Sequence, residues 1–213
     1  MNVTPRLPAN TAKGHPVPAG RSRDFIAVDD GGNFTYHPSE QDLCAAFEYV
    51  EEARSIVDRC GTDFRLALGP HRRVVLGPDL GPVEFHWLRQ AWHASLTVHS
   101  KAHRLQRFFP GTREQLLLDL FECLALERAT AVGAGEGTGD GAWNVEIDGG
   151  QTRVPDLQGV DRLLSGPVRL ERARVRDPFG HVYRPVRHRR HWYLPVVVGH
   201  ILYVEVPPSG ATR

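Results

Sequence analysis

The sequence contains almost no lysine. Lys13 and Lys101 are the two lysines among 26 basic residues in a chain of 213, so the other 24 are arginine. A P-loop needs lysine followed by serine or threonine after a glycine-rich turn, but Lys13 precedes Gly14 and Lys101 precedes Ala102. A Schiff-base enzyme would depend on one of the same two lysines. We therefore expect neither a P-loop nucleotide site nor a pyridoxal-phosphate lysine.

Cysteine and long apolar runs are also scarce. The three cysteines, Cys44, Cys60 and Cys123, include no CxxC pair, so they form no disulfide or zinc framework. No apolar segment of the signal-peptide type follows Met1. The longest apolar run, 192–204, is too short to span a bilayer. The sequence predicts a soluble, reduced, cytoplasmic protein with no membrane segment.

Composition divides the chain into five segments. Residues 1–23 are rich in proline and basic side chains and predict a disordered basic tail, and 208–213 form a second tail. An α+β domain is expected over 24–130, and a β-rich domain or sheet extension over 143–207. The glycine-rich stretch 131–142 between them predicts a linker or loop rather than a phosphate-binding loop. It has no lysine, and its two acidic side chains would repel phosphate.

Within 24–130, the spacing of apolar residues predicts a ββαββ unit followed by two amphipathic helices. The expected hairpins cover 25–36 and 64–76. Ser39 with Asp42 is a capping-box pattern, and it opens a helix expected to run to about Arg59. The further helices are expected over 83–105 and, after the Thr112–Gln115 capping pattern, over 112–128.

The C-terminal part reads as an antiparallel β meander, which makes the whole chain α+β. Hairpins are expected over 143–154 and 168–187, with a short helix over 156–164 between them. Strands 193–198 and 201–206 should flank a two-residue turn at Gly199 and His200, because glycine suits the first central position of a type II′ turn.

The formal net charge of +1 hides a strong segregation of charge along the chain. Residues 24–68 hold ten acidic residues against three arginines, whereas 167–192 hold eight arginines against two acidic residues. Because alternate residues of a strand share a face, Arg172, Arg174 and Arg176 should point the same way. The candidate partner-binding residues of this basic segment are Arg172, Arg174, Arg176, Arg184, Arg187, Arg189, Arg190 and Trp192.

Arginine beside aromatic residues on a sheet is typical of a surface that binds nucleic acid or another acidic partner. The alternative is a solvated face that pairs with the acidic half of the same chain, or of a second copy in a homodimer. A nearly neutral chain lacks the high isoelectric point of most nucleic-acid binders.

The eleven histidines give the best argument for chemistry. His99 and His103 are four residues apart on the expected 83–105 helix, a spacing that lets two imidazoles share a metal. The glutamate of an HExxH motif is missing, so a third ligand would have to come from Glu122, His191 or His200. The alternative is two histidines at the edge of the core, satisfied by hydrogen bonds.

The histidines of the basic segment are expected to be structural or anion-binding, because neighbouring arginines repel a divalent cation. They are His181, His188, His191 and His200. No serine or cysteine nucleophile in a recognisable catalytic context accompanies any histidine, so catalytic residues stay unassigned.

Three functional hypotheses follow. The first is a non-enzymatic interaction or regulatory protein whose arginine-rich sheet docks an acidic protein or nucleic acid. The second is a histidine-dependent enzyme or metalloprotein that uses His99 and His103, with a metal or haem as the cofactor; a cofactor-free enzyme would have its site between the two halves. The third is a binder of a phosphorylated small molecule, which requires arginines that converge on one concavity.

Overall fold

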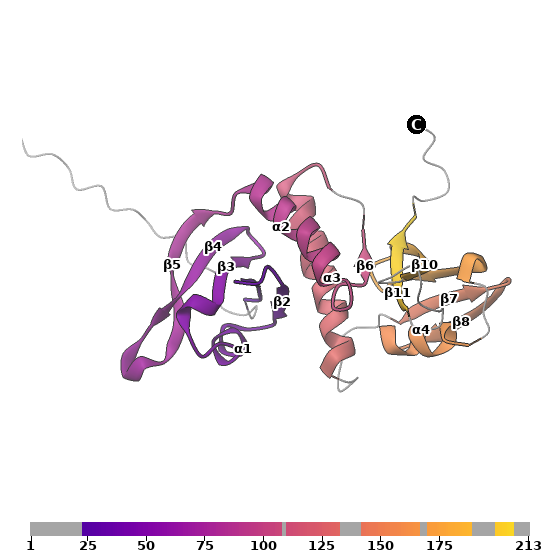
Figure 1. The fold of residues 1–213 in the computed structure, drawn as a ribbon, viewed down its shortest axis with the longest axis horizontal. Helices are drawn as coiled ribbons and strands as arrows, with labels where there is room; N and C mark the ends of the chain where they lie inside the picture. Colours follow the sequence, from indigo (N-terminus) through magenta and orange to yellow (C-terminus); the bar gives the residue numbers. More distant parts are fainter. Residues whose placement is uncertain (1–22, 108–109, 133–141, 167–169, 189–198, 207–213) are drawn as a thin grey trace, which may run out of the picture.

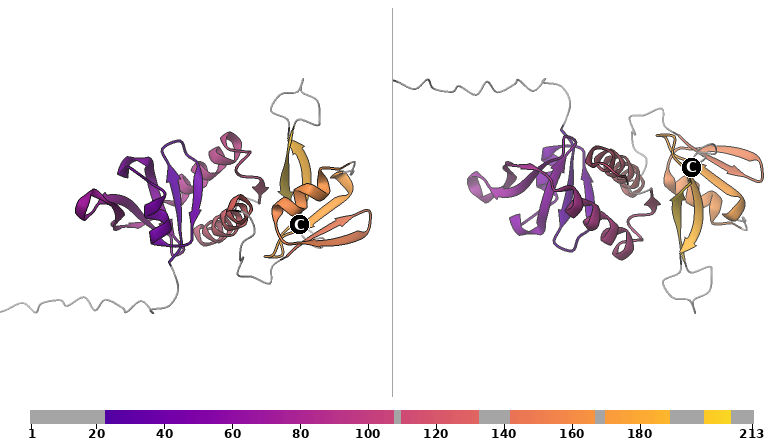
Figure 2. Two further views of the ribbon diagram at one scale, coloured as in Figure 1. Left: turned by 90° about the horizontal axis from the view of Figure 1, so that it is seen from below. Right: turned by 90° about the horizontal axis from the view of Figure 1, so that it is seen from above.

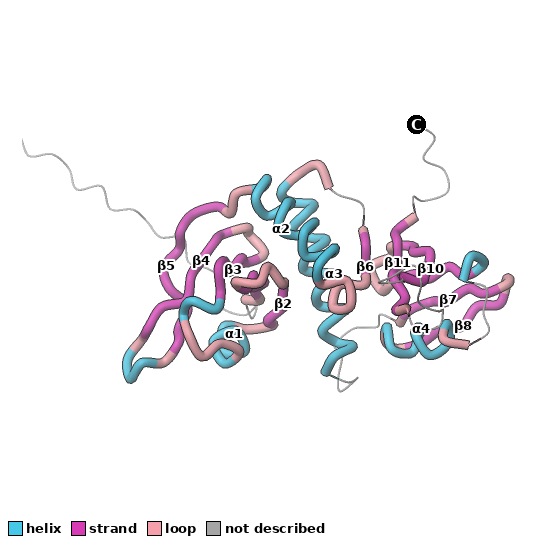
Figure 3. The backbone as a smooth tube through the Cα atoms, in the orientation of Figure 1, coloured by secondary structure: helices cyan, strands magenta, loops and turns pink. Residues whose placement is uncertain are grey.

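The computed structural model describes residues 23–107, 110–132, 142–166, 170–188 and 199–206. These residues form two sheets, with a pair of helices between them (Figure 1). The α+β class predicted from the sequence is therefore confirmed. In Figure 3 the two ends of the molecule are rich in strands and the middle is helical.

The N-terminal sheet is antiparallel, with the strand order β2-β1-β3-β4-β5. Its strands are β1 (Phe25–Asp29), β2 (Phe34–His37), β3 (Ala53–Asp58), β4 (Thr62–Leu68) and β5 (Val74–Pro82). Helix α1 (Glu40–Ala45) lies by one face, and helices α2 (Phe85–Val98) and α3 (Arg113–Val132) cover the other. Because both faces are covered, the first four residues of β1 are all buried, which explains their unbroken apolar run. Both predicted hairpins are confirmed.

The predicted helix from Ser39 to Arg59 is wrong beyond its first turns. The Ser39 hydroxyl does cap α1, accepting from the Asp42 amide at 3.1 Å. However, the Glu52 carboxylate accepts hydrogen bonds from the backbone amides of Glu48 and Tyr49. A single 3₁₀ turn, Val50–Glu52, then stands where the helix was expected to continue. The next six residues then form β3 between β1 and β4, where pairing on both sides outweighs helical periodicity.

Helices α2 (Phe85–Val98) and α3 (Arg113–Val132) lie between the two sheets. The predicted helix over 112–128 is confirmed as α3. The Thr112 hydroxyl caps it by accepting a hydrogen bond from the Gln115 backbone amide at 3.3 Å. The predicted 83–105 helix is too long, because α2 ends at Val98. The Glu127 carboxylate accepts hydrogen bonds from the backbone amides of Arg104 and Leu105. These two residues are therefore not helical, and Leu105 and Gln106 form the short strand β6 (Leu105–Gln106).

The C-terminal sheet has the order β6-β11-β10-β9-β7-β8. Its other strands are β7 (Trp143–Ile147), β8 (Gly150–Val154), β9 (Ala173–Arg176), β10 (Val182–His188) and β11 (His200–Glu205). All pairings are antiparallel except that of β11 with β6, so the predicted antiparallel C-terminal sheet is confirmed, with one parallel edge and with β9 paired to β7 instead of β8. His200 begins β11 opposite His188, so the turn predicted at Gly199–His200 is wrong. The predicted strand 193–198 lies outside the described residues.

Only one face of the C-terminal sheet carries its core. Helix α4 (Leu157–Leu164) packs on that face, which confirms the predicted short helix, and the Asp156 side chain caps it (Figure 2). Trp143, Val175 and Tyr183 are buried there, whereas the alternate positions along β7, β9 and β10 are exposed. The opposite face is therefore available to solvent over these strands.

In the described part of the chain, no helix has both the length and the apolarity needed to cross a membrane.

Candidate functional site

The open face of the C-terminal sheet carries three of the predicted arginines. Arg174 and Arg176 are exposed on β9, and Arg184 is exposed on β10, while Ala173 and Val175 between them are buried. This is the alternation that the sequence predicts. We call Arg174, Arg176 and Arg184 the arginine face.

The strand register places two of these arginines side by side. Val182 of β10 pairs with Arg176 of β9, and Tyr183 pairs with Val175. One residue further along, the same register sets Arg184 opposite Arg174. Like charges in such positions are destabilising unless something compensates them. Arg174 donates to the Ala173 carbonyl oxygen at 2.9 Å, and within the described residues neither Arg174 nor Arg184 forms an ion pair.

The other predicted arginines differ in position. Arg172 precedes β9 in a 3₁₀ turn, so it does not continue the strand face, and it forms an exposed ion pair with Asp148 at 3.1 Å. Arg187 is half-buried near the end of β10. Arg189, Arg190 and Trp192 lie outside the described residues.

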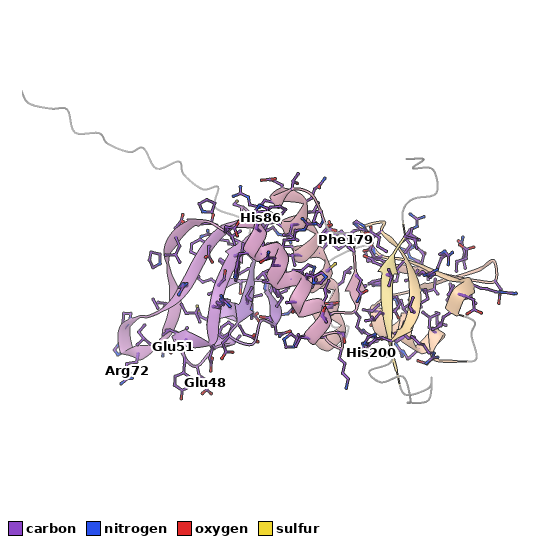
Figure 4. The ribbon with its side chains drawn as sticks, turned by 45° about the horizontal axis from the view of Figure 1, so that its top comes forward. Glu48, Glu51, Arg72, His86, Phe179 and His200 are labelled. Atoms are coloured by element: carbon purple, nitrogen blue, oxygen red, sulfur yellow. The ribbon has the colours of Figure 1, made fainter. Side chains whose placement is uncertain are left out.

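The acidic half of the chain does not neutralise the arginine face in the described residues. Its ion pairs run to Arg23, Arg59 and Arg128, which belong to the N-terminal sheet region and α3. Glu48 and Glu51 project from the end of the molecule that is remote from the C-terminal sheet (Figure 4). Among the described residues, the acidic segment therefore forms its ion pairs with arginines outside the arginine face.

His99 and His103 do not share one helix face. His99 is the C-cap of α2, and its Nε2 lies 3.2 Å from the Gly31 carbonyl oxygen. His103 follows the helix end and is buried, with Nδ1 at 3.0 Å from Glu127 and Nε2 at 3.0 Å from Asn33. The helical spacing on which the shared-metal prediction depended is wrong, although metal binding by either residue stays a prediction.

The two histidines line different clefts. His99 lines a cleft of about 320 Å³ between α2 and the β1–β2 turn. His103 lines one of about 720 Å³ between the two halves of the molecule, together with residues of β2, α3 and His200. The second cleft is where a cofactor-free enzyme was expected to have its site, and Lys101, Arg104 and Arg128 give it a basic lining. Two of these cations are already paired, Arg104 with Asp161 and Arg128 with Asp42.

A buried cluster of charge between α3 and the β9–β10 turn was missed from the sequence. Arg107 lies at its centre, with 3% of its side chain exposed. We call this group the joint cluster; it comprises Arg107, Asp119, Glu122, Asp177, His181, Tyr183 and Glu205.

Arg107 uses all three of its guanidinium nitrogens in the joint cluster. Nε donates to the Tyr183 hydroxyl at 2.9 Å, and one terminal nitrogen donates to the buried Asp177 carboxylate at 2.8 Å. The other donates to Asp119 at 3.2 Å and to Glu122. Burial by itself lowers the pKa of Arg107, but its neighbours raise that pKa by more, among them the hydrogen-bonded Tyr183 and Glu122, so the arginine stays charged.

The neighbouring groups show the opposite effect of burial. Burial raises the pKa of the Tyr183 hydroxyl and holds the pKa of the Cys123 thiol well above its ordinary value, so both groups are neutral near pH 7. Burial also raises the pKa of Asp119, although Arg107 opposes that shift. Cys123 is therefore a packing residue and no nucleophile.

One signal in the sequence could have found part of the joint cluster. Asp119 and Glu122 are three residues apart on a correctly predicted helix, so they share a face. Arg107 and Asp177 lie in turns far apart in the sequence, and only the tertiary structure brings them together.

Comparison with known proteins adds no name to this geometry: no family model, no curated protein and no solved structure matches the chain.

Proposed function

We propose that this protein is a non-enzymatic docking protein whose arginine face binds an acidic segment of another protein. The observation that carries the proposal is the adjacent pair Arg174 and Arg184, exposed on an open sheet face without an ion pair in the described residues. Juxtaposed cations cost stability, and a bound carboxylate would relieve that cost. Arginine also binds carboxylates bidentately.

The composition of the surface favours protein over nucleic acid. Val186 of β10, an exposed aliphatic side chain, lies on the same face as the arginines. A phosphate backbone gains nothing from such an aliphatic side chain, whereas the apolar residues of a protein segment can pack against it. Single-stranded nucleic acid is usually bound by exposed aromatic platforms, and the described part of this face presents none.

The arrangement also argues against a phosphorylated small molecule at this surface. Arg174, Arg176 and Arg184 line none of the clefts described above, because they stand on a sheet surface rather than around a concavity. A phosphate pocket needs several arginines that converge on one point.

A fluorescence anisotropy titration tests the proposal. The probe is a labelled peptide of about 20 residues rich in Asp and Glu, with a single-stranded DNA of equal length as the comparison. We expect the double variant Arg174→Glu/Arg184→Glu to weaken peptide binding at least about tenfold, or ~1.4 kcal/mol. Arg72→Glu/Arg73→Glu is the matched control, because it makes the same charge change at the exposed tip of the β4–β5 hairpin (Figure 4).

Three results would overturn the proposal. Equal weakening by both double variants would show that only overall charge matters. Tighter binding of the DNA, lost in Arg174→Glu/Arg184→Glu, would reassign the arginine face to nucleic acid. Analytical sedimentation of the protein alone tests for a homodimer. Self-association that disappears in Arg174→Glu/Arg184→Glu would identify a second copy of this chain as the partner.

A further inference from the structure

The joint cluster contains three side chains arranged as metal ligands. Asp119 and Glu122 project from α3, and His181 precedes β10. One ligand atom from each lies within 4.8 Å of the other two. We call these three residues the ligand triad. The metal pair considered from the sequence, His99 and His103, does not belong to it.

We propose that the ligand triad binds a divalent first-row transition metal ion such as Zn²⁺. Two carboxylates and one imidazole are a donor set that such ions accept, with a remaining position for water. The proposal goes beyond the docking function and does not depend on it.

The hydrogen bonding of His181 supports this assignment. Its Nδ1 lies 2.7 Å from the Glu205 carboxylate, which can only accept a hydrogen bond, so Nε2 is the ring nitrogen turned toward Glu122. Metal-bound histidines commonly donate their other ring N–H to a carboxylate in this way, which fixes the ring and its tautomer. Glu205 is therefore a positioning residue for the site.

The spacing of the ligand atoms points the same way. Nε2 of His181 lies 3.5 Å from the Glu122 oxygen that also accepts from Arg107, a distance too long for a strong hydrogen bond. Two ligands bound tetrahedrally to zinc at about 2.1 Å are separated by about 3.4 Å. The observed gap therefore matches one edge of a metal coordination tetrahedron.

Charge provides an independent argument. Four carboxyl groups, those of Asp119, Glu122, Asp177 and Glu205, lie around Arg107 and His181. Arg107 supplies one positive charge among them, and a divalent cation would supply two more. Of the basic-segment arginines that were expected to repel a cation from His181, Arg174, Arg176 and Arg184 point to the other face of the sheet.

The site would tie the two halves of the molecule together, since α3 supplies two ligands and the C-terminal sheet region supplies the third. A ligand that binds the folded state alone raises stability according to its concentration relative to Kd. Metal occupancy should therefore raise the unfolding midpoint of the protein.

The test uses the full chain without an affinity tag, stripped with a chelator and titrated with Zn²⁺ by calorimetry. We expect one tight site, weakened at least about 100-fold by His181→Ala and by Asp119→Asn. Glu205→Gln should weaken it about 10- to 100-fold, because it removes only the orienting hydrogen bond. His99→Ala is the matched control, a histidine removed outside the joint cluster, and should bind as wild type does.

Cobalt(II) provides a readout that does not require a variant to fold. Bound at the ligand triad of the wild-type protein, it should give the visible absorption of a four- or five-coordinate ion with nitrogen and oxygen ligands. The proposal is overturned if no stoichiometric site appears, if the cobalt spectrum is that of the hydrated ion, or if His99→Ala removes the site while His181→Ala retains it.

Discussion

Arginine occurs in two contrasting settings in this protein. Arg107 in the joint cluster is buried and bonded to three carboxylates and a tyrosine, so its charge holds α3 to the β9–β10 turn. The arginine face, by contrast, is exposed, and its Arg174 and Arg184 form no ion pair in the described residues. The comparison shows that one side chain can serve stability in one place and recognition in another, according to burial and partners.

The largest effect that separates the two settings is expected from Arg107→Ala. Removing this guanidinium leaves the buried Asp177 carboxylate uncompensated, so we expect a loss of about 3–5 kcal/mol in the free energy of unfolding. Urea denaturation followed by circular dichroism measures it. A loss below about 1 kcal/mol would mean that water or another group replaces Arg107.

Tyr183→Phe removes a single hydroxyl group from the joint cluster and should destabilise the protein less than Arg107→Ala does. The hydroxyl accepts from Arg107 and donates to Asp177, both at 2.9 Å, and its removal should cost about 1–3 kcal/mol. Because burial raises its pKa, the folded state favours the neutral phenol. This preference contributes fully to the free energy of unfolding below the ordinary tyrosine pKa of about 10, and the contribution is lost as the pH rises above that value. The stability of the wild type should therefore fall more steeply between pH 10 and 12 than that of Tyr183→Phe.

Salt should act on the two settings unequally. Raising the ionic strength from about 0.05 to 0.5 M shortens the screening length, so binding of the acidic peptide to the arginine face should weaken at least about tenfold. The buried contacts of Arg107 are screened much less, and the unfolding free energy should change by less than about 0.5 kcal/mol. If salt changed the free energies of peptide binding and of unfolding by similar amounts, the arginine face and Arg107 would not differ in the way proposed.

The smallest expected effect is that of Arg184→Ala on stability. The side chain is exposed and forms no ion pair in the described residues, so the unfolding free energy should stay within about 0.5 kcal/mol of wild type. The same variant should still weaken binding of the acidic peptide. A large loss of stability would show that Arg184 has a structural role.

The local elements of this fold follow from the sequence. The hairpins at Asp29–Asn33 and Asp177–Gly180, the caps at Ser39, Thr112 and Asp156, and the alternation along β9 depend on neighbouring residues alone. These are the features that turn chemistry and strand periodicity predict.

The errors have a common cause in tertiary contacts. Residues 53–58 have helical spacing, yet β1 and β4 pair with them on both sides. Leu105 continues the apolar pattern of α2, yet the Glu127 carboxylate takes its backbone amide and β11 pairs with it. The joint cluster depends on contacts between residues up to 76 positions apart in the chain, which no local pattern encodes.

The claim that the arginine face is a docking surface has its most direct test in an NMR titration of the wild-type protein. The acidic peptide is added to ¹⁵N-labelled protein, and the backbone amide shifts are mapped on the structure. The proposal predicts that the largest changes fall on β9 and β10, around Arg174, Arg176 and Arg184, with little change at Arg72 or Arg73. Changes centred on the β4–β5 hairpin or on the cleft lined by His103, with β9 and β10 unaffected, would contradict it.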